Sequence, residues 1–424
     1  MKIFIHTLGC KVNQFESQAI ATMLRERGNE IVESAEGCDV IIVNTCAVTA
    51  EAVRKSRQEI SRFKALAPGA VTAVCGCWSQ TEPENAEKLG IDVLYGSGDK
   101  KSFVEAILSK SKAFSVDDSF ARRQFEPLPS GAAGERTRAL LKIEDGCVNF
   151  CTYCIIPYAR GRVRSLPLEA CADEAKKLAL AGYREIVLTG IEIASYGKDL
   201  DGSPTLTDAV CAIASSAPEC RIRLGSLEPT VVTEDFASRL RDCGNVCDHF
   251  HLSLQSGCDK TLKNMNRKYG TARFYEAAEL LRRYFPNCGI TCDLITGFPG
   301  ETDSDHAETL AFIEKCAFSA MHVFPYSRRR GTKADAMDCQ VEKRVKQARA
   351  REAIAVAKRM QRDFLRSQVG KMLPVLFETE ENGVWQGHTT NYLLCRAEGI
   401  NLRNTVKNVL IDSVEGDSLK GTIQ

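Results

Sequence analysis

The chain has 424 residues, of which 44% are hydrophobic and 26% charged, and its net charge at pH 7 is only +1. These values are typical of a globular protein with about three domains of roughly 150 residues each. No apolar run is long enough to span a bilayer, and the first residues lack the apolar core of a secretory signal. We therefore expect a cytoplasmic protein with no membrane partner. Its 19 cysteines are expected to bind metal or to pack as small apolar side chains, not to form disulfides.

Residues 1–125 alternate apolar strands with amphipathic helices, which predicts a doubly wound parallel sheet. Cys10, Cys46 and Cys77 each follow one of these strands. The carboxyl ends of parallel strands meet at one edge of a sheet, so these thiols form a candidate metal-binding set. Cys75 lies at the same strand end as Cys77 and is an alternative ligand. The predicted strands are 2–7, 40–44, 70–74 and 91–95, and the predicted helices are 16–27 and 52–66.

Residues 126–137 are rich in proline, glycine and polar residues and are predicted to be a linker. Strands and helices then alternate again through residues 138–366. Six strand–helix repeats predict a partial (β/α)6 barrel, short of the eight units of a closed barrel. The predicted strands are 139–144, 185–189, 221–225, 249–254, 289–294 and 319–325, and the predicted helices are 168–181, 206–215, 273–285 and 306–316.

Three cysteines with the spacing C-x3-C-x2-C follow the first barrel strand: Cys147, Cys151 and Cys154. Three thiolates this close can reach one small metal centre, and sulfur ligands favour zinc or iron–sulfur. A closed zinc site needs four ligands, and no histidine lies nearby in the sequence. We therefore favour a [4Fe-4S] cluster with one iron open to a substrate, with zinc as the alternative.

Residues 328–366 carry 13 lysines and arginines against 5 acidic residues, and most of them fall on a long helix predicted over 341–368. Such a run is either a solvated helix face or a contact for a phosphate backbone. Residues 367–424 contain short strands at 373–378, 384–388, 392–396 and 406–411, which predict a small antiparallel β-barrel. Barrels of this kind bind oligonucleotides or dock proteins. Because this one has a net charge of −2, the basic helix and residues 328–330 would supply most of any attraction for RNA.

The segment 144–161 resembles the cluster-binding loop of radical S-adenosylmethionine enzymes, with Tyr153 at the usual aromatic position. Residues 7–13 (Thr-Leu-Gly-Cys-Lys-Val-Asn), 44–46 (Asn-Thr-Cys) and 76–80 (Gly-Cys-Trp-Ser-Gln) resemble the three ligand motifs of the methylthiotransferase family. By that pattern Cys77, and not Cys75, is the third ligand. The resemblance covers nearly the whole chain in the family's domain order, including a small RNA-binding barrel of the TRAM type over 367–424.

The resemblance implies an enzyme with two [4Fe-4S] clusters and S-adenosylmethionine. The cluster on Cys147, Cys151 and Cys154 would cleave the cofactor to a 5′-deoxyadenosyl radical. The cluster on Cys10, Cys46 and Cys77 would carry or relay sulfur. The implied partners are tRNA, a sulfur source and an external one-electron reductant of the flavodoxin or ferredoxin type. The candidate cofactor contacts are Tyr153, Thr189, Gly190, Ser226, Gln255 and Arg267, the last as a bidentate partner for the methionine carboxylate.

Residues 9–13 (Gly-Cys-Lys-Val-Asn) and 223–229 (Arg-Leu-Gly-Ser-Leu-Glu-Pro) resemble the family branch that acts on N6-threonylcarbamoyladenosine at position 37 of tRNA. The other branches act on isopentenyladenosine in tRNA or on a ribosomal-protein aspartate. Arg330 departs from the family pattern, which has proline there. A non-catalytic iron–sulfur electron carrier and a zinc-based RNA-binding protein are the rival functions. The candidate substrate contacts are Glu228, Arg328, Arg329 and His388.

Overall fold

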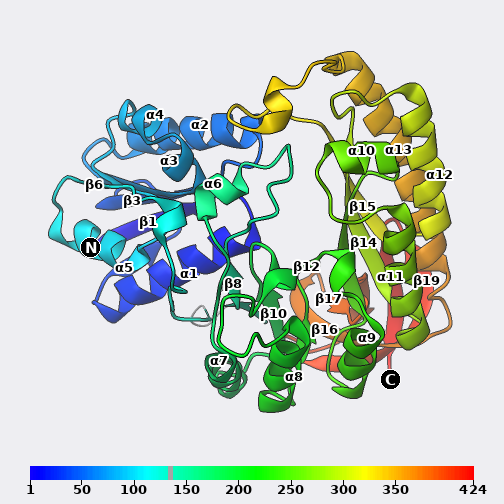
Figure 1. The fold of residues 1–424 in the computed structure, drawn as a ribbon. Coiled ribbons are helices and arrows are strands. Elements are labelled where there is room, and N and C mark those ends of the chain that lie inside the picture. The colour runs from blue at the N-terminus through cyan, green and yellow to red at the C-terminus, as the bar shows by residue number, and fades with distance from the viewer. Residues whose placement is uncertain (132–136) are drawn as a thin grey trace.

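The computed structural model describes residues 1–131 and 137–424 and shows three regions along the chain (Figure 1). A helix-covered sheet forms the N-terminal region, an arc of strands with outer helices forms the centre, and a small barrel forms the C-terminal region. In the predicted linker, Leu128 is buried in the N-terminal core, and residues 132–136 lie outside the described residues. None of the helices in the described ranges is long and apolar enough to cross a membrane.

The N-terminal sheet is parallel throughout, as predicted, with the strand order β2-β1-β3-β4-β5-β6. Its central strand β3 is buried at every position, because helices cover both faces of the sheet. The strands are β1 (Lys2–Thr7), β2 (Glu30–Val32), β3 (Val40–Thr45), β4 (Val71–Gly76), β5 (Val93–Tyr95) and β6 (Ala113–Ser115). The helices are α1 (Lys11–Glu26), α2 (Ala50–Leu66), α3 (Cys77–Thr81), α4 (Pro83–Glu87) and α5 (Lys100–Ser109).

Helix α1 begins at Lys11 and not at residue 16 as predicted, which corrects the position of Cys10. The sequence prediction was wrong here because Lys11 and Gln14 are polar and exposed and obscure the helical period. Val12 and Phe15, on the other side of this first turn, are buried in the described structure. Cys10 is therefore the N-cap residue of the helix.

The central strands form the predicted partial barrel, with parallel neighbours in the orders β11-β10-β7 and β12-β13-β14-β15. The third predicted strand is in fact broken into two, because residues 224 and 225 lie outside the strand pairing. A Cβ atom at Gly225 would lie 2.8 Å from the carbonyl oxygen of Leu188. The strands are β7 (Arg138–Lys142), β10 (Glu185–Thr189), β11 (Arg221–Arg223), β12 (Ser226–Leu227), β13 (His249–Gln255), β14 (Gly289–Thr296) and β15 (Ala320–Pro325), with the short pair β8 (Glu144–Asp145) and β9 (Arg164–Ser165) beside them.

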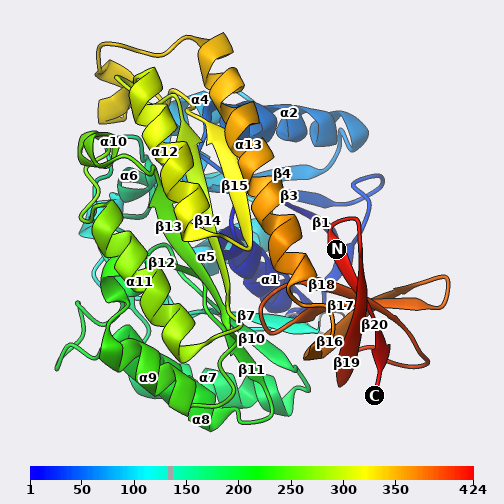
Figure 2. The same ribbon diagram turned by 90° about the vertical axis from the view of Figure 1, so that its right-hand side faces the viewer.

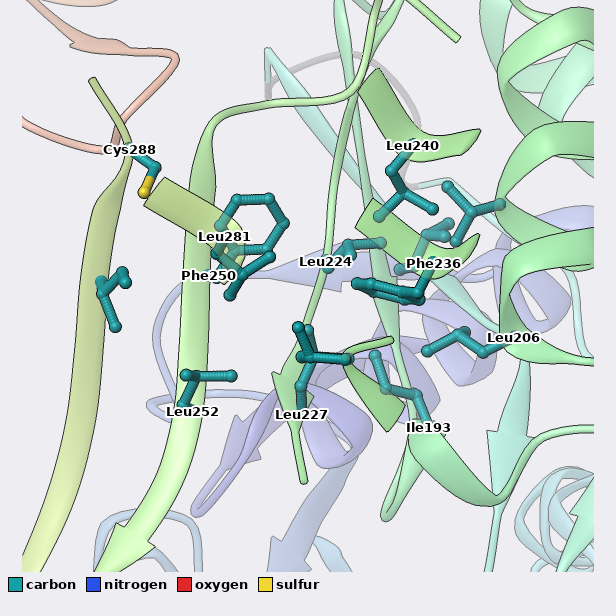
Figure 3. Close-up of a cluster of buried hydrophobic side chains, with 14 of the residues drawn as sticks. Ile193, Leu206, Leu224, Leu227, Phe236, Leu240, Phe250, Leu252, Leu281 and Cys288 are labelled. Carbon is teal, nitrogen blue, oxygen red and sulfur yellow. The ribbon is translucent and has the colours of Figure 1, made fainter. Parts of the chain in front are cut away.

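Helices pack on the outer face of the arc, and Figure 3 shows their apolar side chains against those of the strands. Phe250 of β13 lies beside Leu281 of α11, and Phe236 and Leu240 of α9 belong to the same cluster as Leu227. The outer helices are α7 (Leu168–Leu180), α8 (Leu206–Ser216), α9 (Glu234–Asp242), α11 (Thr271–Tyr284) and α12 (Asp303–Cys316), with α6 (Ile156–Arg160) and α10 (Asp259–Asn264) in the loops. Helices α9 and α10 were not predicted from the sequence. Short 3-10 helices lie at Ser119–Ala121, Ile193–Ser195, Pro229–Val231 and Lys333–Ala336.

The basic helix α13 (Lys343–Arg366) runs along α12 and the edge strand β15 (Figure 2). Ala353, Val356 and Met360 of α13 belong to the central core, so one face is apolar and the other carries the charges. The chain then enters a closed five-stranded barrel with the order β16-β17-β18-β20-β19, which confirms the predicted small β-barrel. The barrel is not antiparallel throughout as predicted, because β18 and β20 pair in parallel. The strands are β16 (Met372–Glu381), β17 (Val384–Thr389), β18 (Leu394–Glu398), β19 (Val406–Glu415) and β20 (Ser418–Ile423), of which β20 was not predicted.

The C-terminal barrel docks at the amino ends of the first central strands. Arg221 and Arg223 at β11 bind Glu185 at the start of β10, and they also donate hydrogen bonds to the backbone carbonyls of residues 388–390. Tyr392 stacks on His249, with ring centroids 4.7 Å apart. The barrel therefore occupies the end of the arc opposite the loop of Cys147, which follows the carboxyl end of β7.

Candidate metal centres

The loop after β7 brings Cys147, Cys151 and Cys154 together, as the spacing predicts. The backbone N–H of Cys147 donates to Gly161, and that of Cys154 donates to Cys151, at 3.0 and 2.9 Å. Burial raises the pKa of the Cys154 thiol to about 12, and the charge of Cys151 adds to this rise. Cys147 and Cys154 remain partly exposed. The loop thus holds the three thiols within electrostatic range of one another, where a positively charged centre would favour their ionised form.

The loop is held from the other side of the arc by residues 264–267. The backbone N–H and hydroxyl of Thr152 donate to the carbonyls of Met265 and Asn264, at 3.0 and 2.9 Å. Arg267 donates to the sulfur of Cys151 at 3.1 Å. The segment that carries the predicted cofactor contact Arg267 is therefore also a support for the triad.

The N-terminal cysteines converge although they are far apart in the sequence. Gly9 has a φ of +102°, and a Cβ atom placed there would lie 3.1 Å from the sulfur of Cys46. Burial raises the pKa of Cys77 to about 12, opposed by Arg160, and the charges of Cys10 and Cys46 raise it further, which places the three thiols within electrostatic range of one another. They lie at the carboxyl ends of β1, β3 and β4, where the alternation of strands and helices predicted them.

Cys75 has different surroundings from this triad. It lies on β4 and packs in the core between the sheet and helices α1 and α5. Burial raises its pKa to about 11, and the charges of Lys100 and Glu16 are the next largest influences on it. In the structure Cys75 is a core residue, and Cys77 is the thiol that joins Cys10 and Cys46.

Arg160 connects the two cysteine groups. It ends helix α6, six residues after Cys154, and its Nε donates to the sulfur of Cys77 at 3.3 Å. Its side chain is fully buried and also binds Glu16 and Asp145. The sequence analysis did not identify Arg160. Its only signal was the position of an arginine soon after the cysteine loop, and its contacts depend on the packing of two regions.

Carboxylates collect at the carboxyl ends of the next strands, around the predicted cofactor contacts Thr189 and Gly190. The backbone N–H of Glu192 donates to Oε2 of Glu144 at 2.7 Å, while Oε1 of Glu144 is buried without a partner in the part of the chain that the structure describes. Burial raises the pKa of Glu144, and burial together with Glu228 raises that of Glu192 to about 8. This is an acidic and partly unsatisfied site beside the cysteine loop.

Glu228 and Arg267 are paired at 2.9 Å, and both side chains are buried. Glu228, the predicted substrate contact, is therefore in direct contact with Arg267, the predicted cofactor contact. Tyr153 packs with Met265 and Phe298 beneath the cysteine loop. Of the two remaining predicted cofactor contacts, Ser226 is the first residue of β12 and is exposed, and Gln255 is the last residue of β13.

The other predicted substrate contacts have partners within the chain. Arg329 is buried, donates to the carbonyl of Ala47 beside Cys46 and pairs with Glu82 at 2.7 Å. Arg328 is exposed and pairs with Asp335. His388 bonds to Glu378 and stacks on Tyr392 in the docked turn of the C-terminal barrel.

The donor set fits iron–sulfur clusters better than a single ion. Within residues 1–131 and 137–424, no three cysteine, histidine, aspartate or glutamate side chains are placed to hold one ion. A cubane spreads its thiolate ligands more widely than an ion does, and both groups offer three thiols. A glycine allows a close approach of the chain at each group: besides Gly9, a Cβ atom at Gly146 would lie 1.9 Å from the carbonyl oxygen of Arg162.

Comparisons with known proteins agree with this arrangement. Residues 141–313 match the family model described as Radical SAM superfamily, and residues 2–96 match the one described as Uncharacterized protein family UPF0004. The chain is 37% identical over 404 residues to the threonylcarbamoyladenosine tRNA methylthiotransferase MtaB of Bacillus subtilis (strain 168), covering 92% of this chain and 89% of that protein. For the protein of the same name from Thermotoga maritima the identity is 36% over 391 residues, with 92% and 89% covered.

A relative with a different name is nearly as similar. The tRNA-2-methylthio-N(6)-dimethylallyladenosine synthase of Acetivibrio thermocellus is 32% identical over 433 residues, covering 99% of this chain and 90% of that protein. Among solved structures, the radical S-adenosylmethionine methyltransferase TsrM from Kitasatospora setae has a TM-score of 0.59 at 14% identity, covering 85% of this chain and 89% of that chain. That likeness shows a shared fold.

Proposed function

Because the chain belongs to the tRNA methylthiotransferase family of radical S-adenosylmethionine enzymes, we propose that it converts N6-threonylcarbamoyladenosine at position 37 of tRNA to the 2-methylthio derivative. The observation that carries this proposal is the presence of two cysteine triads on two parallel sheets, joined through one buried arginine. The choice of substrate is supported by the higher identity to the relatives named for threonylcarbamoyladenosine than to the one named for dimethylallyladenosine.

The first triad and its surroundings would bind the cofactor. Cys147, Cys151 and Cys154 would hold a [4Fe-4S] cluster, which together with S-adenosylmethionine would supply radical chemistry able to take a hydrogen atom from an unactivated C–H bond. Arg267 would bind the methionine carboxylate with its paired N–H groups. Glu144 and Glu192 lie where the methionine ammonium would lower their raised pKa values, so cofactor binding and carboxylate ionisation would favour each other.

The second triad, Cys10, Cys46 and Cys77, would hold a second [4Fe-4S] cluster that carries or relays the sulfur. The partners in this proposal are tRNA, a sulfur source and a one-electron reductant of the flavodoxin or ferredoxin type, in the cytoplasm. The turn that holds Arg329 to the carbonyl of Ala47 follows the edge strand β15 and reaches this triad from the opposite side of the arc from Arg160.

The exposed face of α13 is the proposed contact for the RNA backbone. Arg349 of this helix is buried on Glu301 and Asp303 and is not available to RNA. The C-terminal barrel is less suitable, because four carboxylates and only two cations line its hollow of about 590 Å³, and this excess of negative charge would repel phosphates. The exposed cations that α13 and the preceding turn present include Arg330, Lys333, Lys343, Arg351, Lys358 and Arg362.

An aromatic pair on the inner face of β15 is the proposed support for the adenine ring. Phe324 is 51% exposed and stacks with His322, which is also exposed. Their strand neighbours Met321 and Val323 pack into the core, so the alternation of side chains turns this pair toward the inside of the arc. RNA-binding proteins commonly stack unpaired bases on such rings.

The proposal is tested with anaerobically reconstituted protein and tRNA that carries threonylcarbamoyladenosine, isopentenyladenosine or unmodified adenosine at position 37. We expect mass spectrometry of the nucleosides to show a methylthio product from the first substrate only. Cys151→Ala should lose both 5′-deoxyadenosine and product, whereas Cys46→Ala should still cleave S-adenosylmethionine without forming the product. Cys75→Ala is the matched control and should form it normally. Product formation by Cys46→Ala would refute the role of the second triad.

The second candidate is the reaction on isopentenyladenosine in tRNA. The 32% identity over nearly the whole chain to the Acetivibrio thermocellus relative favours it as the alternative. A product from the isopentenyladenosine substrate, with none from threonylcarbamoyladenosine, would establish this function instead.

A further inference from the structure

We propose that Arg160, which belongs to the loop of the first triad, is a positioning residue of the second triad and raises the reduction potential of the cluster held there. This inference rests on the proposed function, because it requires an iron–sulfur cluster on Cys10, Cys46 and Cys77. One loop of the protein would then form the cofactor site and also raise the reduction potential of the second cluster.

The contacts of Arg160 reach all three cysteine-bearing segments. Its Nε donates to Cys77 at 3.3 Å, and one Nη donates to Oδ1 of Asn13 at 2.8 Å. The side-chain nitrogen of Asn13 in turn donates to the carbonyl of Leu8, two residues before Cys10, at 2.8 Å. It also donates to the carbonyl of Thr45, directly before Cys46, at 3.0 Å. A fixed orientation of Arg160 and Asn13 therefore sets how the three thiols stand relative to one another.

Burial fixes the guanidinium in this orientation. The side chain of Arg160 is 0% exposed, and Glu16, which it binds with both Nη atoms, is 1% exposed. Asp145, two residues before Cys147, accepts a further hydrogen bond at 3.4 Å. All three nitrogens of the group thus have partners, and the Nε–H is left pointing at the sulfur. Lysine has no such planar fork and would not reproduce these contacts.

The charges around Arg160 have an excess of cations. Glu16 and Asp145 are the two carboxylates in the ion pairs of this network, and Glu126 is a third carboxylate close to Lys142. Against four cations the balance is one positive charge, before any cluster is counted. Positive charge and N–H···S hydrogen bonds stabilise the reduced and more negative state of an iron–sulfur cluster, so both raise its reduction potential. The cations that bind these carboxylates are Lys100, Lys142, Arg160 and Arg164.

A purely structural role would predict a different result. If Arg160 only held the two regions together, its replacement would lower the stability of the protein and leave the potential of a loaded cluster unchanged. Arg349 provides a matched control, because it is also buried (6% exposed) and also binds two carboxylates, Glu301 and Asp303. Its replacement should lower stability without any effect on the cluster.

The test uses the full-length chain with Cys147, Cys151 and Cys154 replaced by alanine, so that the N-terminal triad alone holds iron. In this chain Arg160→Gln, Arg160→Lys and Arg349→Gln are compared by optical and electron paramagnetic resonance redox titration. We expect Arg160→Gln to lower the ratio of reduced to oxidised cluster at least tenfold at a fixed potential, which is ~59 mV for one electron. The ratio for Arg160→Lys should lie between that of Arg160→Gln and that of the chain with Arg160 unchanged. The ratio for Arg349→Gln should stay within twofold of the ratio for the chain with both arginines unchanged.

An iron-loaded Arg160→Gln chain whose potential equals that of Arg349→Gln would overturn the inference and leave the proposed function intact. If Arg160→Gln binds no iron while Arg349→Gln binds it fully, the positioning role is supported, and Arg160→Lys then decides the effect on the potential. If the chain with Arg160 unchanged binds no iron at its N-terminal triad, the proposed function itself fails. Iron content is therefore measured first.

Discussion

Glu185 is the residue on which the attachment of the C-terminal barrel depends most. It is fully buried at the start of β10 and binds Arg221 and Arg223, whose remaining N–H groups hold the carbonyls of residues 388–390. Burial alone would raise the pKa of Glu185, but the two guanidinium groups outweigh burial and lower it from its usual 4.5 to about 2. A difference of this size corresponds to about 3 kcal/mol of stability.

We predict that Glu185→Gln lowers the free energy of unfolding by about 3 to 5 kcal/mol at pH 7, because it also leaves two buried arginines without a counter-charge. The folded pKa of Glu185 lies below the unfolded value. Its contribution is therefore complete above pH 4.5 and declines as the pH falls toward 2. At pH 3.5 the wild-type protein should have lost about 1.4 kcal/mol of this stabilisation by Glu185. The variant has no carboxyl at position 185 and should show no such loss.

The assay is urea unfolding of both proteins at pH 7, 5 and 3.5, followed by tryptophan fluorescence and circular dichroism. The difference between wild type and variant should shrink at pH 3.5, while the two curves run parallel between pH 5 and 7. Arg241, exposed and paired with Asp242, offers a control: Asp242→Asn should change stability by less than 1 kcal/mol. An effect of Glu185→Gln below 1 kcal/mol at pH 7 would refute the reasoning.

Three further predictions concern the ligands. Arg267→Lys should weaken S-adenosylmethionine binding by about 10- to 150-fold at unchanged iron content, because one charged bidentate contact is lost; equal affinity in equilibrium dialysis would contradict this. Arg351→Gln combined with Arg362→Gln should lower the slope of log tRNA affinity against log salt by about 1 to 2, and an unchanged slope would remove α13 from the RNA contact. Phe324→Ala should lower tRNA affinity roughly 5- to 150-fold without changing that slope. Phe114→Ala, at an equally exposed phenylalanine of the N-terminal sheet, should leave affinity unchanged, and equal losses in both variants would count against stacking.

The fold and both triads could be predicted from the sequence because they depend on local signals. Strand–helix alternation fixes the parallel sheets, and cysteines directly after strands must reach the carboxyl edge. The spacing C-x3-C-x2-C keeps Cys147 and its two partners on one loop. The late start assigned to α1 and the missing strand β20 are errors of the same local method, since an exposed polar turn and a short mixed strand carry little periodicity.

The contacts between the three regions could not be predicted from local sequence patterns. Arg329 was predicted as part of the basic turn 328–330, and His388 as part of the RNA-binding barrel. The sequence does not reveal that Arg329 is buried on Glu82 or that His388 lies in the docked turn. No role was predicted for Arg160, because the neighbouring sequence does not distinguish it from an exposed arginine. Arg160 and Arg329 each contact a partner more than 80 residues away in the sequence. His388 lies in the turn of the C-terminal barrel that docks on Arg221. Local periodicity describes neither kind of contact.

The two buried arginines that touch the N-terminal region come from opposite edges of the central arc. Arg160 follows the loop after the first strand β7, and Arg329 follows the last strand β15. One binds Cys77, and the other binds the carbonyl next to Cys46. The N-terminal sheet therefore spans the side of the arc that the missing strands of a closed barrel would occupy, with its cysteine edge turned toward the loop of Cys147. A partial barrel allows this arrangement, whereas two further strands between β15 and β7 would keep the second triad away from the loop of Cys147.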